Sequence, residues 1–246
     1  MNRAFIQGVP IDIATAEEAA IRVISRTMRG ERTTIGAVNA AIVVASSRNR
    51  ELLESLRSFD LIIADGKWVA VAASLLSCSQ VPHTNTSPFL RALFSRWIDP
   101  GPRVFLLGAR PEIVRIAANR LPELFPNVTV AGFHDGYFEP DEEQMIIDEI
   151  NKSHADILFI GISSPKKELF LRSHWADLHT STAFGIGGLI DIWGGRTREA
   201  PEWIRHNGFE WLFRMVQEPR RLLKRYTVDN LTFLYICLRQ SLGGLD

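Results

Sequence analysis

The sequence has few cysteines, no excess of either charge and no long hydrophobic run. Its 246 residues include only Cys78 and Cys237, which lie far apart without metal-ligand spacing, so neither a disulfide framework nor a metal site is predicted. Lys and Arg number 28, as do Asp and Glu, which argues against nucleic acid as the partner, because domains that bind it are usually strongly basic. The nearest candidate for a transmembrane helix, residues 231–242, is interrupted by Arg239 and Gln240 and is too short to cross a membrane. The N-terminal residues lack a long apolar run, so we expect no signal peptide.

The remaining composition predicts an α/β protein. A hydrophobic content of 46% over this length suits one large domain, or a domain with an appendage. Short apolar stretches alternate with helical patterns, which favours a mostly parallel sheet with helices on both faces and right-handed crossovers. The expected strands are residues 5–6, 9–12, 33–38, 61–64, 103–107, 128–131, 157–160 and 182–184. The expected helices are residues 15–29, 39–48, 50–58, 66–76, 87–98 and 141–153, with others beginning at 111 and 166.

Asp65 follows the apolar stretch Leu61-Ile62-Ile63-Ala64 and precedes a glycine. In an open parallel sheet, ligands bind outside the carboxyl ends of the strands, so a carboxylate here is well placed for chemistry. The alternative is that Asp65 caps the following helix, since Asp is a favoured N-cap residue. Asn39 and the glycines at 108, 161 and 187 also follow expected strands. These residues are therefore expected to gather along one edge of the sheet with Asp65.

Several short patterns in the sequence are candidate ligand sites. Gly108-Ala109-Arg110 joins a strand to a helix at Pro111, the arrangement that holds a phosphate, although only one glycine remains. Gly185-Ile186-Gly187-Gly188 lacks the spacing of a dinucleotide fingerprint, which argues against a nicotinamide-dependent oxidoreductase. His134-Asp135 has no third metal ligand at useful spacing. The serines before Pro165 lack the Gly-x-Ser-x-Gly frame of a serine hydrolase.

The composition changes after Pro201. Aromatic residues mix with arginines, and between residues 214 and 225 the only acid is Glu218. A basic amphipathic segment with aromatic residues is typical of a helix on a membrane surface. The alternative is a C-terminal helix that packs on the core and presents a solvated basic face.

A set of motifs in family order resembles the WecG/TagA/CpsF glycosyltransferases, bacterial enzymes that add a sugar from a nucleotide donor to a lipid-linked acceptor. The resemblance covers roughly residues 5–225, and its C-terminal motifs are specific. The motifs are Asp65-Gly66, residues 104–108, residues 132–138, Ser164-Pro165-Lys166 with Glu168, residues 185–191, residues 198–203, residues 210–214 and Glu218-Pro219-Arg220-Arg221.

The resemblance implies a Rossmann-like core over residues 1–200 and a basic appendage over residues 201–246. The appendage is expected to dock on the cytoplasmic face of the bacterial inner membrane and to help close the active site. The implied reaction is an inverting transfer from a UDP-sugar to a polyprenyl-diphosphate-linked saccharide in exopolysaccharide or cell-envelope synthesis. Neither a metal nor a cofactor is expected, and family members self-associate through apolar surface, so a homo-oligomer is a further expectation.

The resemblance also assigns roles to residues. Asp65 matches the family's usual base, and Asn39 and Lys167 are expected beside it in the catalytic pocket. On the donor side we expect Tyr137 to stack near the nucleotide and Asp191 to lie near its base. The other expected donor-binding residues are Gly108, Ala109, Arg110, Gly161, Pro165 and Gly187. The residues expected to face the acceptor or a diphosphate are His83, Arg214, Arg221 and Lys224.

Several positions depart from the family pattern, among them Ala37, His83, Ser87 and Lys167, and the phosphate turn Gly108-Ala109-Arg110 lacks the usual glycine pair. One interpretation is a site retuned for another sugar or acceptor, for which Lys167 and His83 suit an acidic sugar. The other is a catalytically silent subunit that binds nucleotide-sugar or membrane. For Lys167 a third interpretation is a solvated first turn of a helix. Because the expected base and the C-terminal arginines remain, we favour an active enzyme.

Overall fold

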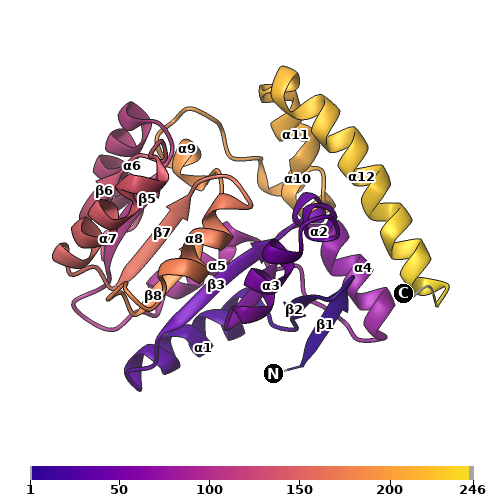
Figure 1. Cartoon of the computed structure of the whole chain (residues 1–246), viewed down its shortest axis with the longest axis horizontal. Helices are drawn as coiled ribbons and strands as arrows, with labels where there is room; N and C mark the ends of the chain where they lie inside the picture. Colours follow the sequence, from indigo (N-terminus) through magenta and orange to yellow (C-terminus); the bar gives the residue numbers. More distant parts are fainter. Residues whose placement is uncertain (1, 244–246) are drawn as a thin grey trace. The chain divides into compact units, whose positions relative to one another are not determined.

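The computed structural model describes residues 2–243, without the side chains of residues 206, 220, 221 and 223–226. Its strands are β1 (Arg3–Ile6), β2 (Val9–Asp12), β3 (Thr33–Val38), β4 (Leu61–Ala64), β5 (Arg103–Gly108), β6 (Thr129–His134), β7 (Ile157–Gly161) and β8 (Thr182–Gly185). Its helices are α1 (Ala16–Met28), α2 (Ala40–Ser46), α3 (Arg50–Ser58), α4 (Lys67–Ser77), α5 (Thr86–Ser95), α6 (Pro111–Leu124), η1 (Pro140–Glu142), α7 (Glu143–Lys152), α8 (Lys166–His174), α9 (Leu189–Trp193), α10 (Glu202–Asn207), α11 (Glu210–Gln217) and α12 (Pro219–Ser241). Figure 1 shows these elements along the chain.

The predicted parallel sheet is confirmed. Six strands pair in the order β4-β3-β8-β7-β5-β6, and β1 and β2 form a separate antiparallel pair. The non-consecutive order requires crossover connections, which the helices supply, because parallel neighbours cannot be joined by tight turns. The central register brings Leu106 opposite Phe159, and Phe159 opposite Phe184. The strands read as continuous apolar runs because helices flank the sheet.

The chain divides into two compact units. Unit 1 comprises Met1–Ala16, Ala37–Thr86 and Glu199–Asp246, and unit 2 comprises Glu17–Gly36 and Ser87–Arg198. The C-terminal helices thus belong to the same unit as β4 and α4. The expected division into a core and an appendage at residue 200 concerns function, and it stays a prediction.

The core of unit 2 is aromatic. Phe159 on β7 packs edge-on against Phe94 of α5, with ring centroids 6.0 Å apart, and against Trp193 of α9 at 5.9 Å. Phe89 meets Phe184 of β8 in the same way at 5.3 Å. Offset and edge-to-face contacts are the favoured geometries of aromatic pairs. The sheet edge of unit 2 therefore rests on a well-filled interior, with α6 packed against β5 and β6.

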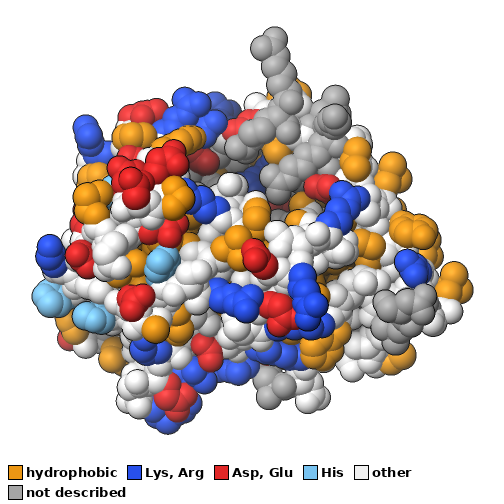
Figure 2. Space-filling model, in the orientation of Figure 1, with side chains coloured by type: hydrophobic (Ala, Val, Ile, Leu, Met, Phe, Trp, Pro, Cys, Tyr) orange, Lys and Arg blue, Asp and Glu red, His pale blue; other side chains and the backbone are white. Residues whose placement is uncertain are grey.

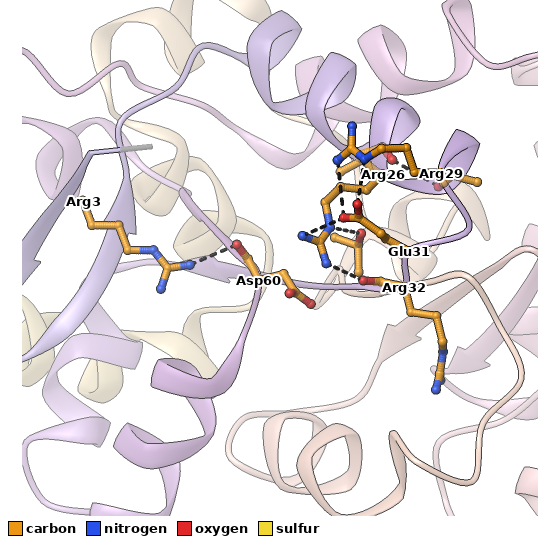
Figure 3. A network of polar contacts seen from close by, with 9 residues as sticks. Arg3, Arg26, Arg29, Glu31, Arg32 and Asp60 are labelled. Atoms are coloured by element: carbon orange, nitrogen blue, oxygen red, sulfur yellow. Dashed lines mark hydrogen bonds and ion pairs between the residues drawn. The ribbon is translucent and has the colours of Figure 1, made fainter.

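Buried polar contacts fix the strands of unit 1. Asp12 accepts from Arg3 Nε at 3.1 Å and from the backbone N of Ile62 at 2.7 Å. The other end of the Arg3 guanidinium donates to the carbonyl oxygens of Phe59 and Asp60, both at 3.0 Å (Figure 3). Since Asp12 is almost fully buried, this pairing satisfies its charge and ties β2 to the start of β4.

A similar group of contacts orders the turn before β3 in unit 2. Arg26 and Arg29 both reach the carboxylate of Glu31, at 3.3 Å and 2.6 Å (Figure 3). Arg26 also donates to Thr33 Oγ1 and to the carbonyl oxygen of Arg32. These contacts fix the path from the last turn of α1 into β3.

The element boundaries agree with the sequence prediction to within a few residues, and three helices illustrate the differences. The helix expected from Asn39 to about Arg48 ends at Ser46, and the helix expected from Ser87 begins at Thr86. The helix expected over 141–153 is split, because Pro140–Glu142 forms a 3-10 turn capped by Glu139 before α7 begins. Local capping thus moves helix ends by a few residues without changing the order of elements.

Candidate active site

Unit 1 contains a cavity of about 560 Å³. Its walls come from the first turn of α2, the end of β4, helix α4 and the C-terminal helices α10, α11 and α12. Four residues predicted for the site line it: Asn39, Asp65, His83 and Arg214. The structure therefore brings together expected residues that are up to 175 positions apart in the chain.

Asp65 does not cap α4. The cap position belongs to Gly66, which makes no side-chain capping hydrogen bond, and φ at Gly66 is +133°. The Asp65 carboxylate instead accepts from Thr86, with its Oδ1 3.3 Å from the backbone N and 3.2 Å from Oγ1. The capping interpretation is wrong because the positive φ of Gly66 turns the chain before the helix begins. The carboxylate is thereby placed in the cavity wall.

Asn39 has a structural task in addition to its place in the cavity. Its Oδ1 accepts from the backbone N of Ile42 at 3.1 Å, which caps α2. The backbone N of Asp65 donates to the carbonyl oxygen of Val38 at 2.9 Å, so the ends of β3 and β4 lie together. Capping fixes the Asn39 side chain in one orientation, as a site residue requires.

Two cavity residues, Arg205 and Glu210, were missed by the sequence analysis. Glu210 begins α11, and Arg214 follows one turn later, a spacing that puts both on one helix face and could have indicated the pair. Arg205 comes from α10 and pairs with Glu199 at 2.7 Å. No local pattern identifies Arg205, because only tertiary packing brings it into the cavity that Asp65 also lines.

The charges around Glu210 oppose one another. Burial and the nearby negative charge of Asp65 raise the pKa of Glu210 to about 7, while Arg214 and Arg205 act in the opposite direction and Glu199 adds to the rise. Asn85 Nδ2 donates to Glu210 Oε2 at 3.4 Å. Carboxyl groups with strongly perturbed pKa values are common in active sites, so Glu210 beside Asp65 indicates that this wall of the cavity carries the catalytic groups.

The opposite walls of the cavity are apolar and partly open to solvent. Trp68 and Leu75 on α4, and Leu234 and Leu238 on α12, line the cavity with more than half of their surface exposed. Figure 2 shows apolar side chains gathered over the region of α12. Cys237 lies among them, and burial raises the pKa of its thiol to about 11. The cavity thus combines a charged wall with a long apolar surface.

The C-terminal cations are described only in part. Arg214 lines the cavity. The side chains of Arg221 and Lys224, expected at a diphosphate, lie outside the part of the chain that the structure describes. Their assignment stays a prediction.

In unit 2 the expected phosphate turn is built from glycines in close contact. A Cβ on Gly108 would lie 2.6 Å from the carbonyl carbon of Gly161, and φ at Gly108 is +146°. A Cβ on Gly161 would lie 3.1 Å from the carbonyl oxygen of Gly187. Gly136 also belongs to this group, since its backbone N donates to the carbonyl oxygen of Ala109 at 2.9 Å. The turns after β5, β7 and β8 therefore meet at one edge, as predicted.

The remaining expected donor residues also belong to unit 2. Arg110 is the exposed N-cap residue of α6, and Pro165 is exposed at the start of α8. Tyr137 has 69% of its surface exposed, which leaves its ring accessible for stacking. Asp191 pairs with Arg196 at 3.2 Å. No bound ligand tests these roles, which stay predictions.

Lys167 is not on a solvated first turn, so that interpretation is wrong. Its ammonium forms an ion pair with Glu168, and both side chains are almost fully buried. Its methylene groups pack where a Cβ on Gly185 would lie, 3.1 Å from Cε. Lys166 is also engaged, donating to the carbonyl oxygen of Phe138 at 2.7 Å with its ammonium 3.9 Å from the ring centroid.

Two general features bear on what the chain can bind. Among the described residues, no group of three or more His, Cys, Asp or Glu side chains is placed to hold a metal ion. His134 Nδ1 lies 2.9 Å from the carbonyl oxygen of Asp135. No helix within residues 2–243 combines the length and the apolar character needed to span a bilayer.

The motifs and the fold can be compared with known protein families. The sequence model described as the glycosyl transferase WecG/TagA/CpsF family matches residues 4–246, nearly the whole chain. The match includes the strand that precedes Asp65, the glycine turn of unit 2 and the three C-terminal helices. The chain belongs to the WecG/TagA/CpsF family of glycosyltransferases.

Proposed function

We propose that this glycosyltransferase moves a sugar from a UDP-sugar to a polyprenyl-diphosphate-linked saccharide with inversion at the transferred carbon, in exopolysaccharide or cell-envelope synthesis. The observation that carries the proposal is the cavity of unit 1, where Asp65 shares a wall with Arg205 and Arg214 and faces apolar helices. A lipid diphosphate needs cations for its phosphates and apolar surface for its chain. Both occur in this cavity beside a carboxylate.

The donor diphosphate is assigned to the glycine turn of unit 2. Gly108 lets the backbone of β5 approach β7 closely, and the turn leads into the 14-residue helix α6. Free backbone N–H groups and the helix dipole make such an N-terminus favourable for a phosphate. This is how the chain would hold UDP without a metal.

The transfer requires a base and stabilisation of the leaving group. Asp65 takes the proton from the acceptor hydroxyl as its oxygen forms a bond to the sugar carbon C1. The bond from C1 to the UDP oxygen breaks on the opposite side, and UDP leaves with the electron pair. N–H donors and arginines stabilise the negative charge that develops on UDP.

The substitution of Asp65 by Asn tests the base. The Asn side chain can still accept from Thr86, so we expect a folded protein whose transfer of labelled sugar falls by a factor of about 10³. Asp141→Asn, at an exposed position in unit 2, is the matched control and should keep full activity. Undiminished transfer by Asp65→Asn would remove Asp65 as the base. A wild-type protein that binds UDP but never transfers sugar would instead be the silent subunit.

We propose further that α12 docks on the membrane surface. Leu231 is 70% exposed and Tyr235 is 63% exposed on this helix, an unusual density of exposed apolar groups. Leu231→Glu should lower the affinity for anionic lipid vesicles, measured by sedimentation, at least tenfold, since burying a Leu side chain contributes about 1.5–3 kcal/mol. Leu124→Glu, at a half-exposed position in unit 2, is the control. Equal vesicle binding by both variants would contradict docking through α12.

A further inference from the structure

One loop of unit 1 holds two carboxyl groups of the cavity. Thr86 donates to Asp65 through its backbone N and its hydroxyl, and the preceding residue, Asn85, donates to Glu210. The loop itself is fixed by Thr84, whose Oγ1 donates to the carbonyl oxygen of Ala14 at 2.7 Å and whose N donates to that of Ala64. Consecutive residues therefore set the positions of the strand-end carboxylate and of the first residue of α11.

The hydrogen bonding accommodates either charge state of Glu210, because the amide of Asn85 donates to its carboxyl group and also carries an acceptor. Asn85 is almost fully buried, and its Oδ1 has no hydrogen-bond donor among the described residues. A protonated carboxyl group carries the O–H that such an acceptor lacks, whereas a carboxylate only accepts. The Nε of Arg205 is likewise buried without an acceptor among the described residues. An anionic ligand in the cavity would supply an acceptor for this Nε.

Several ionisable groups act on Glu210 or line the same cavity. They are Asp65, Lys67, His83, Glu199, Arg205, Arg214 and Cys237. Arg205 is already paired with Glu199, so an ionised Glu210 leaves the two guanidinium groups facing three carboxylates. A neutral Glu210 shifts the balance toward positive charge by one unit.

We propose that Glu210 is a positioning residue for acceptor binding: the charge that it carries beside Asp65 determines how tightly Arg205 and Arg214 hold a diphosphate in the cavity. The proposal rests on the assignment of the acceptor diphosphate to this cavity. Protonated Glu210 leaves the arginines available for charge-assisted hydrogen bonds to the diphosphate. Ionised Glu210 competes with the diphosphate for them, and it adds repulsion.

A diphosphate whose own charge is constant tests the proposal. The probe is a symmetric dialkyl diphosphate with short chains, a diester that carries two negative charges throughout the neutral range. Its Kd for the full-length chain is measured by calorimetry at pH 6 and pH 8.5. For the wild type we expect Kd to rise about tenfold over this range, the linkage that one pKa unit of coupling produces.

Glu210→Gln keeps an acceptor for Asn85 and removes the charge. We expect this variant to bind the probe as tightly at pH 8.5 as at pH 6. Glu202→Gln, at an exposed position on α10, is the matched control and should keep the wild-type pH dependence. A Glu210→Gln variant with the full wild-type pH dependence would overturn the proposal. A wild type that fails to bind the probe at either pH would instead overturn the assignment of the acceptor diphosphate to this cavity.

A second measurement needs no variant. The ¹³C carboxyl resonances of the glutamate-labelled wild type should include one that titrates near pH 7, and saturation with the probe should raise its midpoint by about one unit, because linkage is reciprocal. A midpoint that the probe leaves unmoved would contradict the proposal even if Glu210→Gln failed to fold.

Discussion

The two units place their candidate sites by different means. In unit 2 the phosphate turn is made largely by backbone: a Cβ on Gly108 would meet the backbone of Gly161, and a Cβ on Gly161 would meet the carbonyl oxygen of Gly187 as well as the side chain of Ile190. In unit 1 the cavity is made by side chains that come from residues 39 to 241, and a Cβ on Gly66 in its lining would meet no described atom within 4 Å. A site made of backbone tolerates few substitutions at its glycines, whereas a site made of side chains can change specificity one residue at a time.

The two units also differ in where their charged side chains lie. Unit 2 buries one ion pair, Lys167 with Glu168, inside its core. Unit 1 also buries Asp12 against Arg3, but the charges at its candidate site lie in a cavity that solvent or a ligand can reach. Buried pairs are costly to break, and accessible charges are easier to change. Variants in matched pairs, one in each unit, can test this contrast.

The largest effect is expected at the buried ion pair of unit 2. Lys167→Met leaves Glu168 as a buried charge without its cation, which should lower the free energy of unfolding by about 4 kcal/mol. Urea unfolding measures the change. Lys167→Met combined with Glu168→Met should recover most of the loss, because two apolar side chains of similar volume replace the pair. A double variant as unstable as the single one would show that packing, not charge, dominates.

The recovered double variant also tests the role predicted for Lys167 in the catalytic pocket. Once the fold is restored, a change in KM for the UDP-sugar reports contact with the donor separately from stability. A variant with wild-type kinetics would show that Lys167 serves only the core of unit 2.

A pair of glycine substitutions compares the two units directly. Gly108 and Gly66 both have positive φ, +146° and +133°, which strains any other residue. A Cβ on Gly108 meets the backbone of Gly161, whereas a Cβ on Gly66 meets no described atom within 4 Å. We therefore expect Gly108→Ala to destabilise by about 3 kcal/mol more than Gly66→Ala in urea unfolding. Equal losses of stability would mean that β7 shifts to make room for the added methyl group and that the turn is not rigid.

The sequence was sufficient to predict the elements because each carries a local signal. The apolar runs before Asp65 and Gly108 are strands, and Pro111 and Arg50 begin helices, as their patterns indicate. The split near residue 140 was missed because the cap formed by Glu139 and Glu142 competes with a continuous helix. Such a competition is decided by local hydrogen bonds that hydrophobic periodicity does not report.

The candidate site was predictable only where sheet topology fixes it. Asn39 and Asp65 follow strands, so the parallel sheet places both at one edge. Arg205 and Glu210 lie at helix positions that could equally face solvent, and the packing of α10 and α11 within unit 1 decides their orientation. The buried setting of Lys167 was missed for the same reason, since an exposed helical start and a buried one share the same pattern.

A smaller, pH-dependent effect on stability is expected at Glu210 in the cavity of unit 1. The folded-state pKa of Glu210, about 7, lies above the ordinary value of 4.5, so the folded state binds its proton more tightly than the unfolded state. Its ionisation therefore destabilises the fold progressively from about pH 4.5 to pH 7, and fully above that range. Glu210→Gln removes this penalty. The gain in the free energy of unfolding of the variant over the wild type should therefore be about 2 kcal/mol larger at pH 8 than at pH 5. Thermal unfolding at both pH values measures it, and an equal shift at both would contradict the role of charge.

The smallest effect concerns residues other than glycine with positive φ, of which each unit offers an example near its site. Cys78 ends α4 in unit 1 with φ of +51°, and Ala109 follows Gly108 in unit 2 with φ of +58°. Glycine adopts this conformation without the steric cost of a Cβ, so Cys78→Gly and Ala109→Gly should each stabilise by about 0.5–1 kcal/mol in urea unfolding. Cys78→Ala keeps the strain and is the control that separates backbone relief from loss of the exposed thiol. If Ala109→Gly destabilises while Cys78→Gly stabilises, the methyl group of Ala109 packs within the phosphate turn, and unit 2 depends on one side chain as well as on its glycines.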